Sequence, residues 1–234
     1  MVDFDFLVRN IDFTNVNPAS SFEEIGELCI KANEYSVKTI YVQPIFLSYV
    51  KSKLKKDIDI GTTGGFPFGN IPLQIKLNEI EYAAKNRAKW IDICINLSNV
   101  KSKKWNKVRE EIFELRKKSM QESIGLKIIL EIPFLTNNEI VKLVSISEEE
   151  KIEFLKTASG VRNKITLDQL KFIKPLLKYC KIKVAGGIST LKDANEFFEN
   201  GANVIGSSKG FEILEESLNG RNSINPARKE PGLY

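Results

Sequence analysis

Residues 181–210 read KIKVAGGISTLKDANEFFENGANVIGSSKG, and this stretch contains the repeating unit of the fold. An aliphatic run at 181–185 ends in two glycines, and Thr190 with Asp193 three residues later forms the capping pattern that begins a helix. Asn200-Gly201 ends that helix, and a second aliphatic run at 203–205 leads into another glycine loop. The order of strand, helix and strand predicts a parallel βαβ unit with a right-handed crossover.

The same alternation extends along the chain. Aliphatic runs predict strands at residues 11–14, 38–42, 58–63, 90–95, 126–132, 152–155, 181–185 and 203–205. Amphipathic stretches predict helices at residues 21–35, 72–86, 103–123, 137–144, 166–179, 190–200 and 211–218. Eight strands are the number that closes a barrel, and 234 residues are near the ~250 that is usual for one.

An open doubly wound sheet is the alternative, but no GxGxxG follows the first strand. We therefore predict an α/β fold, a single-domain (β/α)8 TIM barrel over residues 1–218. Residues 219–234, which hold glycines, prolines and several asparagines, are expected to form a mobile C-terminal tail.

The composition excludes several classes of protein. The chain has no histidine, which rules out Ser-His-Asp and Cys-His catalysis and histidine metal sites. Three scattered cysteines argue against a disulfide framework or a zinc site and fit a reducing compartment. The net charge of +5 is dispersed, and no signal peptide or bilayer-length apolar stretch is visible. We expect a cytoplasmic protein without nucleic-acid or membrane partners.

Three ionisable residues interrupt apolar runs that are predicted as strands four, six and seven: Asp92, Lys156 and Lys183. Taken singly, each could be an edge residue that reaches solvent or one arm of a structural ion pair. Taken together, they are expected to converge at the mouth of the barrel, because catalytic residues stand at the C-terminal ends of barrel strands.

Two lysines on neighbouring strands favour a particular chemistry. Each ammonium disfavours protonation of the other, and burial acts in the same direction, so one lysine can be a neutral amine near pH 7. A neutral amine attacks a carbonyl to form a Schiff base, and a nearby carboxylate can move the protons. This chemistry needs no cofactor and no metal.

Glycine and hydroxyl residues follow the last two predicted strands, at Ala185-Gly-Gly-Ile-Ser-Thr190 and Gly206-Ser-Ser-Lys-Gly210. Phosphate-binding barrels hold the phosphate on these loops, although the same residues are also ordinary turn formers. Thr157-Ala-Ser-Gly160 adds a hydroxyl and backbone N–H groups after strand six. The loop Gly61–Gly69 either walls the mouth or only shapes a crossover.

Five motifs resemble those of the deoxyribose-phosphate aldolase family. They are Gly65-Phe-Pro-Phe-Gly69, Ile91-Asp-Ile-Cys-Ile-Asn96, Phe154-Leu-Lys-Thr-Ala-Ser-Gly160, Lys183-Val-Ala-Gly-Gly-Ile188 and Ile205-Gly-Ser-Ser-Lys-Gly210. Their order and spacing agree over residues 11–210. The resemblance implies a metal-free and cofactor-free class I aldolase. Such an enzyme reversibly cleaves 2-deoxy-D-ribose 5-phosphate, a small sugar phosphate, into D-glyceraldehyde 3-phosphate and acetaldehyde.

The resemblance also implies roles for single residues. Lys156 matches the Schiff-base lysine, Lys183 the second lysine that lowers its pKa, and Asp92 the acid/base aspartate. The residues matching substrate- and phosphate-binding positions are Asp12, Thr14, Asn17, Thr157, Gly160, Gly186, Gly187, Gly206, Ser207 and Ser208. Tyr234 is similar to the C-terminal tyrosine of some members, whose tail reaches the site.

The chain departs from the family pattern at several positions. Tyr41 stands where many members have cysteine, Ala158 where serine is usual, and Ile132 where a threonine follows the glutamate. Ser189 replaces a basic residue, and Val161-Arg162 differs from the common forms, so phosphate affinity and substrate identity stay open. Arg162 and Lys209 are the candidates for the missing cation.

Three other functions stay open. They are a Schiff-base aldolase for another sugar phosphate, a phosphate-binding isomerase or epimerase, and a non-catalytic sugar-phosphate binder. The last has no need for two buried lysines. A homodimer is also left open, because barrels of this kind often pair but no surface stripe marks an interface.

Overall fold

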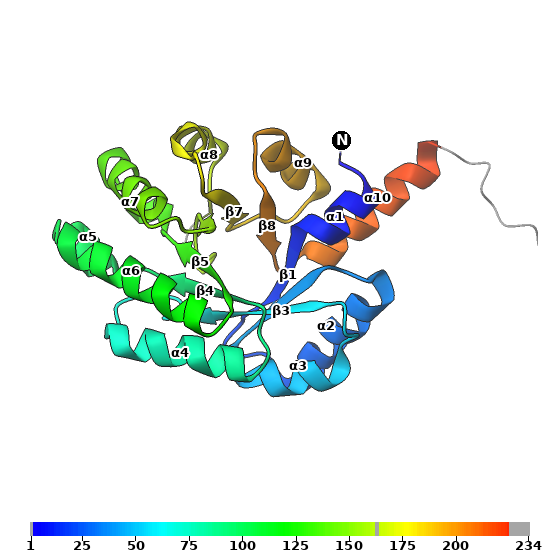
Figure 1. Ribbon diagram of the computed structural model, residues 1–234. Coiled ribbons are helices and arrows are strands. Elements are labelled where there is room, and N and C mark those ends of the chain that lie inside the picture. Colours follow the sequence, from blue (N-terminus) through cyan, green and yellow to red (C-terminus); the bar gives the residue numbers. More distant parts are fainter. Residues whose placement is uncertain (1, 162–163, 225–234) are drawn as a thin grey trace, which may run out of the picture.

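The computed structural model describes residues 2–161 and 164–224, and its eight strands form a closed parallel barrel (Figure 1). The strands pair in chain order, and β8 closes the barrel against β1 with Asp12 opposite Gly206. They are β1 (Ile11–Asn15), β2 (Thr39–Val42), β3 (Asp59–Gly64), β4 (Trp90–Cys94), β5 (Gly125–Ile129), β6 (Phe154–Lys156), β7 (Lys181–Ala185) and β8 (Val204–Ser207). The predicted (β/α)8 barrel is confirmed.

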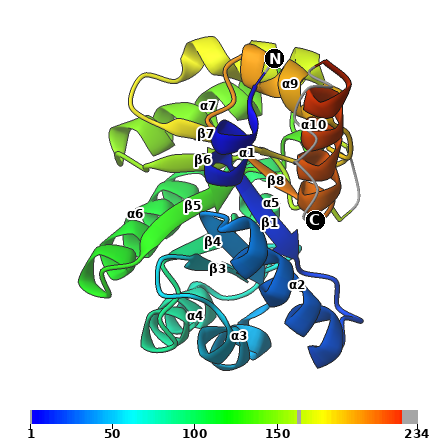
Figure 2. The same cartoon turned by 90° about the vertical axis from the view of Figure 1, so that its right-hand side faces the viewer.

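Helices surround the barrel, and Figures 1 and 2 both place α1 beside α10. The α-helices are α1 (Phe4–Asn10), α2 (Phe22–Tyr35), α3 (Leu47–Lys53), α4 (Leu73–Lys85), α5 (Leu97–Lys101), α6 (Trp105–Gln121), α7 (Asn137–Glu149), α8 (Leu167–Ile173), α9 (Leu191–Glu199) and α10 (Gly210–Ile224). Short 3₁₀ turns are η1 (Pro44–Phe46), η2 (Ile132–Phe134) and η3 (Lys174–Leu176). In the described ranges, no helix has the length and apolar character to cross a membrane.

Local capping fixes where several helices begin. At the start of four helices, the capping side chain accepts a hydrogen bond from the backbone N–H three residues later. The side chain of that later residue accepts a hydrogen bond from the backbone N–H of the capping residue. The four caps are Ser21, Thr136, Thr166 and Thr190. These reciprocal bonds satisfy N–H groups that a helix start leaves free. The Thr190 cap, predicted from the sequence, holds the short loop between β7 and α9.

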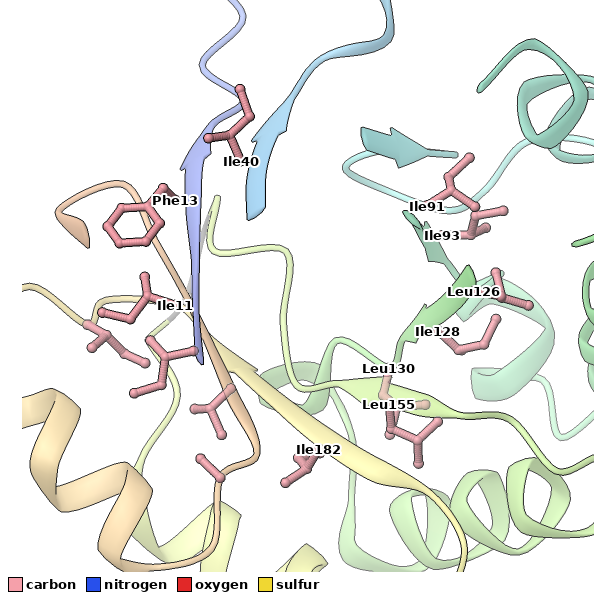
Figure 3. Close-up of a cluster of buried hydrophobic side chains, with 14 of the residues drawn as sticks. Ile11, Phe13, Ile40, Ile91, Ile93, Leu126, Ile128, Leu130, Leu155 and Ile182 are labelled. Atoms are coloured by element: carbon pink, nitrogen blue, oxygen red, sulfur yellow. The ribbon is translucent and has the colours of Figure 1, made fainter. Parts of the chain in front are cut away.

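The alternation of strand side chains separates an apolar shell from a charged barrel interior. Figure 3 shows aliphatic side chains of this shell, among them Ile91, Ile93 and Ile182. Because successive side chains of a strand point to opposite faces, Asp92 lies on the face of β4 opposite to Ile91 and Ile93. The same rule directs Lys183 of β7 away from Ile182. The helices therefore cover an aliphatic surface, and ionisable side chains are left to fill the barrel.

Some predicted boundaries are wrong. Strand β5 ends at Ile129 rather than residue 132, because Glu131 takes a left-handed conformation with φ of 55° that ends the ladder. Strand β6 spans Phe154–Lys156, whereas the sequence predicts a strand over residues 152–155. Helix α10 continues to Ile224, so the expected boundary at residue 219 falls within a helix. Residues 225–234, with Tyr234, lie outside the described residues.

Candidate active site

Lys156 ends strand β6 at the wall of a polar pocket of about 310 Å³. The segments that follow β1, β6, β7 and β8 form the rest of this wall. The Lys156 side chain is 5% exposed, so its amine is shielded from bulk water. A substrate in this pocket therefore meets the lysine at the C-terminal end of a barrel strand.

Asp92 and Lys183 lie behind Lys156, without any exposure to solvent. The Lys156 Nζ is 3.0 Å from Asp92 Oδ2, and the Lys183 Nζ donates a hydrogen bond of 2.8 Å to the same oxygen. Strands β6 and β7 pair with Lys156 opposite Lys183, which puts the two lysines side by side. The structure therefore brings together the three residues that the sequence singled out.

Two further charges extend this cluster. Asp12 Oδ2 lies 2.7 Å from Lys183 Nζ and accepts a hydrogen bond of 3.0 Å from Lys127 Nζ. Lys127 was missed by the sequence reasoning, although it interrupts an aliphatic run of β5 in the same way that Lys183 interrupts β7. Its ammonium faces the rings of Trp90 at 4.5 Å and Phe154 at 5.0 Å. A lysine flanked by aliphatic residues in a predicted strand was therefore a usable signal.

Charge balance in the buried cluster favours one neutral amine. Three lysines (Lys127, Lys156 and Lys183) face two carboxylates (Asp12 and Asp92), all nearly excluded from solvent. Burying an uncompensated charge is costly, so the site is most stable when one amine has lost its proton.

Burial and a neighbouring charge act against the charged form of Lys156. Burial lowers its pKa, the neighbouring Lys183 adds to this effect, and Asp92 opposes it. Burial also works against the charged form of Lys183, but Asp12 and Asp92 together raise its pKa above the ordinary value. The surroundings of Lys156 therefore favour its neutral form and those of Lys183 favour its charged form, and burial lowers the pKa of Lys127 as well.

Asp92 stays ionised at the centre of the cluster. Burial alone would raise its pKa, but Lys183, Lys156 and Lys127 hold that pKa well below the usual range. Oδ1 of Asp92 has no hydrogen-bond partner among the described residues. One oxygen of Asp92 thus contacts both lysines.

The loops after β7 and β8 form the polar side of the pocket. Of the residues predicted to bind substrate, Thr14, Asn17, Gly160, Gly186, Gly187, Gly206, Ser207 and Ser208 line it. Gly206 is required for packing, because a Cβ there would lie 2.9 Å from Lys183 Cε. The Ser207 hydroxyl donates to the Ile188 carbonyl oxygen at 2.7 Å and accepts from the Lys209 N–H, so it holds the two loops together.

Two predicted substrate-binding residues do not line the pocket. Thr157 is fully buried, and its hydroxyl donates to the Ala185 carbonyl at 3.1 Å and accepts from the Ala185 N–H at 3.0 Å. Its hydrogen-bonding capacity is therefore used to join β6 to β7. Asp12 belongs instead to the charged cluster behind the pocket. Neither residue is part of the pocket wall, and substrate binding by either one stays a prediction.

Ser159 and Glu131 were missed and lie at the mouth. Ser159 lines the polar pocket, and its N–H donates a hydrogen bond of 2.8 Å to Glu131 Oε2. Both residues also line a neighbouring, more apolar pocket of about 240 Å³ together with Pro67 and Phe68. The loop after β3 thus contributes to a wall of the mouth, one of the two roles the sequence left open.

One of the two residues predicted to provide a cation for the phosphate, Lys209, is part of the pocket wall. Lys209 lines the pocket beside Ser189, and its Nζ pairs with Glu212 Oε1 at 2.8 Å. Arg162, the other candidate, lies outside the described residues. No group of three or more acidic or cysteine side chains converges as a metal site in residues 2–161 and 164–224.

Comparison with known proteins gives matches along nearly the whole chain. The family model described as DeoC/LacD family aldolase matches residues 2–216. A deoxyribose-phosphate aldolase of Thermococcus kodakarensis is 32% identical over 214 residues, 89% of this chain and 96% of that protein.

Solved structures agree with the sequence matches. An aldolase described as QR15 has a TM-score of 0.88 at 33% identity and covers 96% of this chain and 99% of its own. A deoxyribose phosphate aldolase of Aeropyrum pernix, described as having a unique tetrameric structure, has a TM-score of 0.81 at 26% identity, with 91% of this chain and 90% of that chain covered. With its buried lysine amine at the end of β6, the chain belongs to the DeoC/LacD aldolase family.

Proposed function

We propose that the chain is a class I aldolase that reversibly cleaves 2-deoxy-D-ribose 5-phosphate into D-glyceraldehyde 3-phosphate and acetaldehyde. The observation that carries the proposal is the position of Lys156. Its amine meets the polar pocket, and Asp92 and Lys183 support it from behind. The substrate is inferred from the names of the relatives, and the reaction type is inferred from the geometry of the site.

Binding of the phosphate orients the sugar. The loops after β7 and β8 offer backbone N–H groups close to three glycines, and α10 begins at Gly210 directly after the second loop. A helix N-terminus and glycine-rich backbone favour an anion. The phosphate is held on that side of the pocket, and the aldehyde carbon of the open-chain sugar is directed to Lys156.

Schiff-base formation uses the free amine of Lys156. The nitrogen lone pair attacks the C1 aldehyde and gives a carbinolamine, whose hydroxyl leaves as water to form an iminium ion. Lys183, which keeps its proton, supplies the acid that this loss of water requires. The positive iminium then lies beside ionised Asp92, which stabilises it.

Carbon–carbon cleavage follows from the electron demand of the iminium. Asp92, through a water molecule and together with Lys183, removes the proton of the C3 hydroxyl. The C2–C3 electron pair moves into the iminium to form an enamine, and glyceraldehyde 3-phosphate leaves. The proton taken from the C3 hydroxyl is returned through the same relay to the enamine carbon, which regenerates an iminium. Addition of water to this iminium releases acetaldehyde, restores the Lys156 amine and returns a proton to Lys183.

Borohydride trapping tests the proposal. Wild-type protein is incubated with 2-deoxyribose 5-phosphate, reduced and digested, and the adduct is located by mass spectrometry. We expect the adduct on Lys156, and Lys156→Ala should abolish both the adduct and turnover while the circular dichroism spectrum stays that of the folded protein. A folded Lys156→Ala protein with more than a trace of turnover would show that the nucleophile is assigned wrongly.

Side-by-side assays separate the alternatives. Cleavage of ketose phosphates faster than 2-deoxyribose 5-phosphate would indicate an aldolase for another sugar phosphate. Phosphate binding without a Lys156 adduct would indicate the isomerase or the non-catalytic binder instead.

Two further properties belong to the proposal. We infer a self-associating protein, and the tetramer described for the Aeropyrum pernix relative supports this. Sedimentation velocity distinguishes a monomer, the homodimer and a tetramer. A cytoplasmic location is supported by the three free cysteines, and cell fractionation tests it.

A further inference from the structure

Tyr41 is a fully buried residue at the centre of the charged cluster, and the proposed reaction gives it no role. It lies on β2, is 1% exposed, and pairs in register with Thr14 of β1 and Gly61 of β3. A Cβ at Gly61 would lie 2.3 Å from the tyrosine ring, so the ring occupies space that only glycine leaves. Gly61 of β3 therefore leaves the space that the Tyr41 ring of β2 occupies.

The ring is in direct contact with Lys183. The Lys183 Nζ lies 3.5 Å from the ring centroid, which is close for a cation–π contact. Lys127 is more distant from the same ring, at 5.1 Å. The face of an aromatic ring carries negative charge density and attracts an ammonium, most strongly where water is excluded.

This contact completes the surroundings of the Lys183 ammonium. An ammonium has three N–H donors. The Lys183 Nζ lies 2.7 Å from Asp12 Oδ2 and 2.8 Å from Asp92 Oδ2, so these two carboxylate oxygens engage two of the three donors. The ring face is the third favourable surface around the charge. Among the described residues, Lys156 has one close ion-pair partner, the Asp92 oxygen that it shares with Lys183, so the two amines differ in how well a proton is accommodated.

We propose that Tyr41 is a positioning residue for the aldol reaction. Its ring holds the Lys183 ammonium between Asp12 and Asp92, so that the proton stays on Lys183 and Lys156 is left as the free amine. This inference rests on the proposed function, because it concerns the lysine that would form the Schiff base. It assigns a role to a residue that departs from the family pattern.

The ring and the hydroxyl of Tyr41 are separable. The hydroxyl is buried and lies close to Asp92. Burial raises the pKa of this hydroxyl well above 10, and Asp92 and Asp12 add to the effect, so it stays neutral. Tyr41→Phe keeps the ring and removes only this buried polar group. Tyr41→Leu and Tyr41→Met remove the ring and retain apolar bulk.

A purely structural role of Tyr41 would leave the pH dependence of Schiff-base formation unchanged, so this pH dependence is the quantity to measure. Lys156 is faced by Asp92 of β4 and Lys183 of β7, and Cys94 and Glu131 also act on it electrostatically. Lys183 is faced by Asp12 of β1, Asp92 of β4, Lys127 of β5 and Lys156 of β6. All of these groups are retained in the three variants. A change in the pH midpoint of Schiff-base formation is therefore attributed to the loss of the Tyr41 ring.

The experiment follows reductive trapping of acetaldehyde on Lys156 across pH in the full-length protein. Nucleophilic attack needs the neutral amine, so trapping is fast above the midpoint and falls as pH decreases through it. In Tyr41→Leu and Tyr41→Met we expect the midpoint to rise by about one pH unit, a ~10-fold slower reaction below it. The rate well above the midpoint should match wild type, and Tyr41→Phe should keep the wild-type midpoint.

The outcomes separate this inference from the proposed function. No Lys156 adduct in the wild type at any pH would overturn the proposed function itself. A normal wild-type profile with unchanged midpoints in folded Leu and Met variants would overturn only the role of Tyr41. A Phe variant that shifts as far as the Leu variant would do the same, because the ring would then not be the determinant. Melting temperatures confirm that each variant is folded.

Discussion

Lys156 combines burial with weak charge compensation. Its side chain is 5% exposed, and its single close carboxylate oxygen is already bound by Lys183. A buried amine without its own counter-charge destabilises the folded state, whether it stays neutral or takes up a proton. The reactivity that the site needs therefore carries a cost in stability, a relation common at active sites.

Replacing the two lysines by methionine measures this difference. We expect Lys156→Met to abolish Schiff-base trapping and to raise the melting temperature by ~2–4 °C, which corresponds to ~1 kcal/mol in a chain of this size. Lys183→Met is the matched control, because it leaves Asp12 and Asp92 with fewer counter-charges and should lower the melting temperature. Differential scanning calorimetry at pH 7 gives both values. Equal destabilisation by the two changes would contradict the assignment of Lys156 as the free amine.

At the scale of secondary-structure elements, periodicity predicted most of the barrel and part of the site. The position of Asp92 and Lys183 in predicted strands led to the expectation that they converge at the barrel mouth, and the same reasoning applies to Lys127. The end of β5 could not be predicted: Glu131 takes a left-handed conformation there, and its side chain accepts a hydrogen bond from Ser159, which follows β6. Contacts between loops that are distant in sequence leave no local pattern.

The short strand β6 depends on a side-chain link that sequence reasoning assigned to substrate. Only residues 154–156 form β6, and Thr157 directly after it donates to and accepts from the Ala185 backbone. A family motif marks Thr157 as important, but it does not distinguish a hydroxyl that binds substrate from one that joins two strands. The distinction needs the direction of the side chain, which the structure supplies.

Thr157→Val tests the structural role. The change keeps the shape and removes both hydrogen bonds, leaving two buried backbone groups of Ala185 without their side-chain partner. We expect a loss of ~1–3 kcal/mol in the free energy of unfolding, measured by urea denaturation. Thr157→Ser, which retains the hydroxyl, should recover most of this stability. KM for 2-deoxyribose 5-phosphate should stay near the wild-type value below the melting transition, and a large rise in KM at unchanged stability would restore the substrate-binding assignment.

Across the whole molecule, different parts of the barrel supply different functions. The buried charges come from β1, β4, β5, β6 and β7, whereas the glycine loops after β7 and β8 form much of the pocket wall. Reaction chemistry and phosphate binding can therefore be changed separately. Motifs predicted both parts, because each lies at the end of a strand. They did not settle which cation faces the phosphate, since that depends on the path of the loops.

Lys209 allows phosphate recognition to be tested apart from the chemistry. It lines the pocket next to the start of α10 and is held by Glu212, while the reacting groups lie in the barrel interior. We expect Lys209→Ala to raise KM for 2-deoxyribose 5-phosphate several-fold, on the order of five, with kcat unchanged, because an exposed charge contributes modestly to binding. Glu212→Gln is the matched control: it frees the Lys209 ammonium and should lower KM. Cleavage of unphosphorylated 2-deoxyribose should be the same in all three proteins, since no phosphate is present to be bound. An equal loss with both substrates would place the effect of Lys209 in the fold rather than in phosphate binding, and steady-state kinetics at low and high salt would measure how much of the KM difference is electrostatic.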